Sequence, residues 1–199
     1  MERFLGDLER AFATSLYPNR VPIAIGLAIL GLILVWQARR RRWHLVARRH
    51  PRRTLAALGV VLVVGGPLAW YLGSPLFIRS ELTETPAGGA TLASGEFSGA
   101  DEFHFGSGRA SIVRTDDGRL VLRFAAFSVR NGPDLFVYVS PDPEGYARGA
   151  VELGTLKATD GAFEYDLPPG SDVAAIRSVV IWCRAFEVQF AVAPLSPVS

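Results

Sequence analysis

The chain has 199 residues, of which 49% are hydrophobic and 20% are charged, and its formal net charge at pH 7 is +2. This small net charge results mainly from two segments of opposite charge. Residues 39–53 hold eight arginines and no acid, whereas the segment from Ser80 onward has sixteen acidic and nine basic side chains. The positive net charge is therefore no evidence for nucleic-acid binding, and none is expected.

The N-terminal tail, residues 1–19, carries Phe4, Leu5, Leu8 and Phe12 near helical spacing. Residues 2–14 fit either a short amphipathic helix on the outer leaflet or on a partner, or a frayed tail. A signal peptide is not expected, because the chain begins with charged residues and the first apolar run starts late.

Two uncharged runs follow, at residues 21–38 and 54–78. At about 1.5 Å per helical residue the first reaches roughly 27 Å, close to the hydrocarbon thickness of a bilayer. The second is longer and contains Pro67 after Gly65 and Gly66, which predicts a kink. Since neither run has a polar face, we expect a transmembrane hairpin over residues 20–78 rather than two buried core helices.

The eight arginines of residues 39–53 predict the orientation of this hairpin, because short loops rich in arginine stay in the cytoplasm. Both chain ends then lie outside the cell membrane, and the basic loop meets anionic lipid head groups. Trp36 and Trp43 near the inner face, and Tyr17, Trp70 and Tyr71 near the outer face, match interfacial aromatic residues.

Residues 79–95 are rich in Gly, Ala, Ser, Thr and Pro, so we expect a tether there. Beyond it, turn signals separate short runs of strand-forming residues, which predicts an all-β sandwich of Ig-like type or a small barrel over residues 96–196. The predicted strands are residues 109–115, 119–129, 134–140, 151–156, 161–167 and 178–193.

Four stretches of this segment resemble the DM-thirteen domain, an extracellular module found beside electron-transfer domains in Skeletor-type proteins. They read "FHFGSGRASI" (103–112), "LVLRFAAFSVRNGPDLFVYVS" (120–140), "ELGTLKATDGAFEYDLP" (152–168) and "VVIWCRAFEVQFAVAPL" (179–195). The resemblance covers residues 94–196 and implies a β-sandwich that acts in redox or electron transfer through a single cysteine, with haem as the suggested cofactor. Carried over to this chain, it points to Cys183 and less specifically to His104, while no companion domain identifies the electron partner.

Cys183 is the only cysteine, set between Trp182 and Arg184. If its sulfur reaches solvent, Arg184 would favour the thiolate and the residue is a redox candidate. If it is buried, it is a small apolar side chain without chemistry. Trp182 belongs to the core unless it borders a cofactor.

The count of ligands limits the metal sites that the outer domain can build. It contains one histidine, His104, and the only methionine is Met1, so neither a blue-copper site nor a four-ligand zinc site is expected. A haem with Cys183 and His104 as axial ligands needs no more residues than the chain has. For His104 the other reading is a hydrogen-bonded structural histidine.

Familiar catalytic motifs such as G-x-S-x-G, a phosphate-binding loop and H-E-x-x-H are absent from the sequence. Twenty arginines against one lysine are typical of a GC-rich bacterial genome, in which the outside is a periplasm or cell-wall space. We therefore expect a membrane-anchored extracytoplasmic redox module centred on Cys183, with an envelope redox partner. The alternative is a non-enzymatic binding or scaffold domain in which Cys183 is inert.

Overall fold

The computed structural model describes residues 19–41, 50–67, 70 and 78–198. The chain divides into two compact units, one of Ser15–Ser74 and one that contains Pro75–Ser199. Each unit is described by itself. The predicted N-terminal helix at residues 2–14, the interfacial residues Tyr17, Trp43 and Tyr71, and most of the basic loop lie outside the described residues.

The first unit is helical. Helix α2 spans Arg20–Arg40, and α4 spans Pro51–Val60 and continues as the π-helical turn η2, Val61–Gly65. The π turn lies just before Pro67, whose missing N–H frees a carbonyl of the preceding turn. Large apolar side chains are exposed along both helices, with Leu32 71% and Val63 74% accessible.

The helical structure expected for these two runs is confirmed wherever they are described. Over the described residues, no helix combines the length and the apolar character needed to cross a membrane. The transmembrane hairpin stays a prediction.

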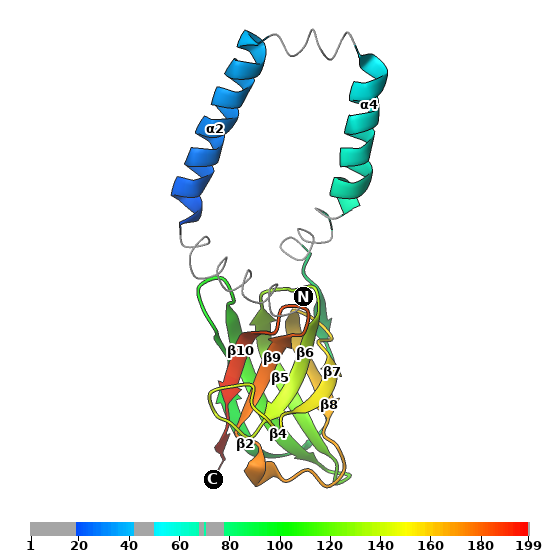
Figure 1. Cartoon of the computed structure of the whole chain (residues 1–199). Coiled ribbons are helices and arrows are strands. Elements are labelled where there is room, and N and C mark those ends of the chain that lie inside the picture. Colours follow the sequence, from blue (N-terminus) through cyan, green and yellow to red (C-terminus); the bar gives the residue numbers. More distant parts are fainter. Residues whose placement is uncertain (1–18, 42–49, 68–69, 71–77, 199) are drawn as a thin grey trace. The chain divides into compact units, whose positions relative to one another are not determined.

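The second unit consists of two β-sheets packed face to face (Figure 1), which confirms the predicted all-β sandwich. The six-stranded sheet has the order β1-β8-β5-β4-β2-β11 and the five-stranded sheet the order β3-β10-β9-β6-β7. The strands of the first sheet are β1 Glu81–Thr83, β2 Gly89–Glu96, β4 Gly106–Thr115, β5 Leu120–Val129, β8 Asp160–Asp166 and β11 Ser196–Pro197. Those of the second are β3 Ser98–Gly99, β6 Leu135–Ser140, β7 Val151–Thr155, β9 Ser178–Cys183 and β10 Val188–Pro194, and a short 3-10 helix, η3, spans Val173–Ala175.

The core between the sheets is rich in aromatic rings. Phe124 and Phe127 both point into it, with ring centroids 4.7 Å apart, although strict alternation would turn Phe127 outward. A β-bulge between them, with Ala126 at φ 47°, inserts the extra residue that returns Phe127 to the inner face. Phe97 packs edge-on against both rings at about 5 Å, which fixes the centre of the core.

The expected tether at residues 79–95 is wrong, because this segment contributes β1 and most of β2 to the six-stranded sheet. β2 pairs with β4, and its small residues permit close packing rather than flexibility: a side chain on Gly95 would overlap the carbonyl of Pro194. Arg79 binds the Asp160 carboxylate through Nε at 2.8 Å, so the sandwich begins at the start of this segment.

The expected single strand over residues 178–193 is also wrong, since the structure divides it into the hairpin β9–β10. The four residues between the strands, 184–187, form a tight turn in which Glu187 has a positive φ of 54°. Here the chain reverses without Gly, Pro, Asn or Asp, the residues that usually mark a turn.

Candidate functional site

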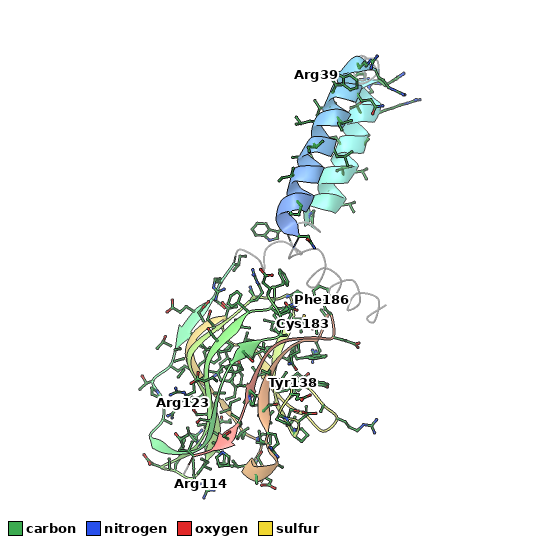
Figure 2. The ribbon with its side chains drawn as sticks, turned by 90° about the vertical axis from the view of Figure 1, so that its left-hand side faces the viewer. Arg39, Arg114, Arg123, Tyr138, Cys183 and Phe186 are labelled. Atoms are coloured by element: carbon green, nitrogen blue, oxygen red, sulfur yellow. The ribbon has the colours of Figure 1, made fainter. Side chains whose placement is uncertain are left out.

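Cys183 is the last residue of β9, in the middle of the five-stranded sheet. It faces Leu135 of β6 on one side and Val188 of β10 on the other. Val179, Ile181 and Cys183 alternate with outward-facing residues, so the sulfur points into the core between the sheets and has no exposed surface. The redox prediction for Cys183 had required a sulfur that solvent can reach, and the structure places it under the β9–β10 turn (Figure 2).

Burial also controls the protonation of this thiol. It raises the pKa of Cys183 to about 11, against hydrogen bonds from the backbone N–H groups of Phe186, Asp134 and Ala185, which lower it. The thiol is therefore protonated at neutral pH. Arg184 was expected to favour the thiolate, but its guanidinium lies 3.7 Å from the ring centroid of Phe136 instead.

His104 is fully buried and lies in the loop between β3 and β4. The carboxylate of Asp101 accepts the backbone N–H groups of Phe103 and His104 and lies 2.8 Å from the imidazole Nδ1. The ring packs against Phe103 and Phe190, with centroids 4.9 and 4.3 Å away. This geometry fits the structural reading of His104, in which Asp101 fixes the loop and the orientation of the ring.

Cys183 and His104 do not fit a haem in this structure. Both side chains are enclosed by the packed core, and neither lines the pocket beside Gly132 or the one beside Trp182. The described residues also contain no group of three His, Cys, Asp or Glu side chains that would hold a metal ion. No chemistry is therefore assigned here to an iron or a haem.

A pocket of about 230 Å³ opens beside the motif Asn131-Gly132-Pro133-Asp134. Gly132 allows close packing there, because a Cβ would lie 3.0 Å from atoms of the Leu135 and Phe190 side chains. The carbonyl of Asp134 accepts the backbone N–H of Arg184 at 3.0 Å. The motif thus supports the β9–β10 turn that covers Cys183.

A larger open pocket of about 680 Å³ lies on the outer face of the five-stranded sheet, on the other side of the strand from the sulfur. We call it the outer pocket. It is lined by Asp134, Tyr138, Tyr146, Trp182, Arg184, Ala185 and Glu187. Trp182, predicted to belong to the core unless it borders a cofactor, is only partly buried and forms one wall.

Sequence reasoning missed the outer pocket as a site. Tyr138, which lines the pocket from β6, is itself buried, and no sequence signal singled out Tyr146 within the turn-rich loop after β6. One signal was available: in β6 the five residues before Ser140 are all apolar or aromatic, so both faces of the strand are apolar. A strand covered on both faces indicates that something packs on its outer side; here the loop that carries Tyr146 covers part of it.

Comparison with known proteins gives one match. A family model described as "Electron transfer DM13" matches residues 96–195, which run from the last residue of β2 to the residue before β11. No curated protein and no solved structure matches the chain.

Proposed function

The chain belongs to the DM13 family of electron-transfer domains, and from this premise we propose that it is a membrane-anchored extracytoplasmic redox module in which Cys183 is the reacting residue. The sandwich offers no other sulfur, since the chain has one cysteine and its only methionine is Met1.

One observation carries the role of Cys183: the only cysteine of this electron-transfer domain ends β9 directly before the four-residue turn at residues 184–187. Burial raises the pKa of its thiol, while backbone N–H groups of Phe186, Asp134 and Ala185 lower the pKa by less. Converging backbone N–H groups stabilise an anionic sulfur, which is the nucleophile of thiol chemistry. When the turn of residues 184–187 opens, a base can remove the thiol proton and the burial that raises the pKa is relieved.

The step that follows is thiol–disulfide exchange with a disulfide of an envelope partner. The Cys183 thiolate attacks one sulfur of that disulfide, a mixed disulfide forms, and the other sulfur leaves as a thiolate. A dithiol of a second envelope partner then attacks the Cys183 sulfur, which releases the first partner as a dithiol, and closes its own disulfide by displacing the Cys183 thiolate. Two electrons pass between partners, and the chain returns to its reduced state.

The membrane anchor is supported by the sequence of the first unit. The apolar runs at residues 21–38 and 54–78 flank eight arginines, and the exposed apolar side chains of α2 and α4–η2 need a covering that water does not provide. A lipid bilayer supplies one. The acidic sandwich then lies outside, with both chain ends.

The test is the rate at which native Cys183 forms a mixed disulfide with oxidised glutathione, followed by mass spectrometry of the purified full-length chain. If the turn opens locally, we expect an adduct that forms more slowly than with an exposed cysteine but faster than the chain unfolds globally. The variant Cys183→Ala gives no adduct and serves as the control. A modification rate equal to the rate of global unfolding would refute the role of Cys183.

That result would favour a second function, a non-enzymatic envelope binding domain with an inert cysteine. The specific observation in its favour is the complete burial of Cys183, together with the high pKa that burial causes. Under this reading the aromatic outer pocket, rather than the sulfur, is the functional feature of the sandwich.

A further inference from the structure

Three of the seven residues that line the outer pocket are aromatic. The rings of Tyr146 and Trp182 stack with centroids 4.5 Å apart and an angle of 21° between their planes. Tyr138 meets Tyr146 at nearly a right angle, 88°, with centroids 5.1 Å apart. The pocket thus has a corner made of two ring orientations, and the face of an aromatic ring carries negative partial charge.

The loop after β6 holds this corner in place. Gln189 of β10 accepts the backbone N–H of Tyr146 at 3.1 Å and donates to the carbonyl of Glu144 at 3.3 Å. Tyr146 nevertheless keeps 45% of its surface exposed, which an aromatic ring with a purely structural role would be expected to bury. The stack is therefore formed before any ligand arrives and is open to solvent.

The charges around the corner are mainly negative. Asp134 and Glu187 line the pocket, and Glu152 borders it through the hydroxyl of Tyr138, which donates to its carboxylate at 2.7 Å. Burial, followed by the hydrogen bond to Glu152, raises the pKa of Tyr138 to about 12, so its hydroxyl remains protonated.

Arg184 is the positively charged side chain among the residues that line the pocket, and its charge is compensated. Its guanidinium lies 3.7 Å from the Asp134 carboxylate and 3.4 Å from that of Glu152, and it stacks on Phe136. Three carboxylates thus face one guanidinium, which leaves the corner with a net charge of about −2.

We propose that the outer pocket binds a small organic cation that carries a quaternary or methylated ammonium group. Aromatic faces attract such a cation through their quadrupoles, and nearby carboxylates add a longer-range attraction. An anion would meet the net negative charge, and an uncharged apolar ligand would leave the carboxylates without a function. This inference goes beyond the proposed electron transfer and does not rest on it.

The test compares choline with its uncharged carbon isostere, in which a quaternary carbon replaces the nitrogen. Both are titrated calorimetrically into the purified full-length chain, in buffer free of other quaternary ammonium compounds. Because the aromatic rings and the nearby carboxylates both favour a positive charge, we expect choline to bind at least about fivefold more tightly than the isostere. Equal affinity of the two ligands, or no binding of choline, would overturn the proposal.

Variants distinguish the cation site from other polar sites. Trp182→Leu keeps an apolar side chain but removes the ring, and should weaken choline binding by about fivefold or more. Arg184→Gln removes the compensated positive charge and should strengthen it. A pocket that holds its ligand through the guanidinium, as a sugar or anion site would, should instead bind more weakly in Arg184→Gln. Loss of choline binding in this variant would refute the cation site.

A matched control removes the same charge elsewhere. Arg114 is exposed and lies at the opposite end of the sandwich from Cys183 and Phe186 (Figure 2). Arg114→Gln should leave the affinity for choline unchanged. A rise in affinity as large as that of Arg184→Gln would mean that net charge alone attracts the cation, and would contradict a site at the outer pocket.

Discussion

Neighbouring residues of one strand have opposite environments in β9. Trp182 lines an open pocket on the outer face, while Cys183 has no exposed surface on the inner face. Because the burial of Cys183 raises the pKa of its thiol from 9.0 to about 11, the folded chain holds this proton more tightly than the unfolded chain. The thiol therefore contributes stability that is complete below about pH 9 and is lost as the pH rises to about 11.

This linkage gives a prediction for alkaline unfolding. The free energy of unfolding of the sandwich should fall by up to about 3 kcal/mol for Cys183 between about pH 8 and about pH 11. Tyr138 and Tyr165, whose pKa values are raised to about 12, chiefly by burial, extend the loss above that range. Urea midpoints measured across this pH range supply the data.

The comparison variant is Cys183→Ala, which cannot ionise. It should start from a lower stability, because it leaves a small cavity in the core, but its curve should be flatter between about pH 9 and about pH 11. Parallel curves for the two proteins would mean that the thiol does not titrate differently in the folded and unfolded chains.

At the scale of elements, the sequence predicted strands well where turn residues bound them. The predicted strands at residues 119–129 and 134–140 agree with β5 and β6 to within one residue at each end. Sequence patterns did not predict the elements that are determined by contacts between distant parts of the chain. The turn at residues 184–187 contains no typical turn residue. It is held instead by tertiary contacts, such as the hydrogen bond from the Arg184 N–H to the Asp134 carbonyl.

The outer pocket was beyond sequence reasoning for a similar reason. Tyr146 and Trp182 are separated by 35 residues, and only the fold-back of the loop after β6 stacks one on the other. Cys183 stands out in the sequence as the only cysteine, but whether its side chain is buried depends on which face of β9 it occupies. A strand between two partners in a sandwich has one buried face, and no local pattern says which residue of the pair Trp182 and Cys183 occupies it.

Strands β1 and β2 give a prediction about where the domain begins. β1 pairs in parallel with β8, and β2 pairs antiparallel with β4, while Arg79 binds Asp160. A fragment of residues 79–198 should therefore fold alone and unfold cooperatively, with circular dichroism typical of strand. A fragment of residues 96–198 loses both strands, exposes the edges of β4 and β8, and should aggregate or unfold at markedly lower urea. Equal stability of the two fragments would show that residues 79–95 do act as a tether.

At the scale of the whole molecule, charge is divided sharply along the chain. Residues 39–53 hold eight arginines without an acid, while the segment from Ser80 onward carries a net charge of about −7, from sixteen acidic and nine basic side chains. A cytoplasmic basic loop and an acidic outer domain are the arrangement that the positive-inside rule favours. Arg52 and Glu144 are exposed members of the two pieces and therefore suitable reporters.

The orientation can be read in intact cells with a thiol reagent that does not cross membranes. In a Cys183→Ala background, Glu144→Cys should react with the reagent in intact cells, whereas Arg52→Cys should react only after the membrane has been permeabilised. Both substitutions lie at exposed positions, so a difference in labelling reports the side of the membrane rather than burial. Labelling of Arg52→Cys alone in intact cells would invert the orientation. Labelling of both in intact cells would mean that residues 54–78 do not cross the membrane, because that single crossing would separate the two positions.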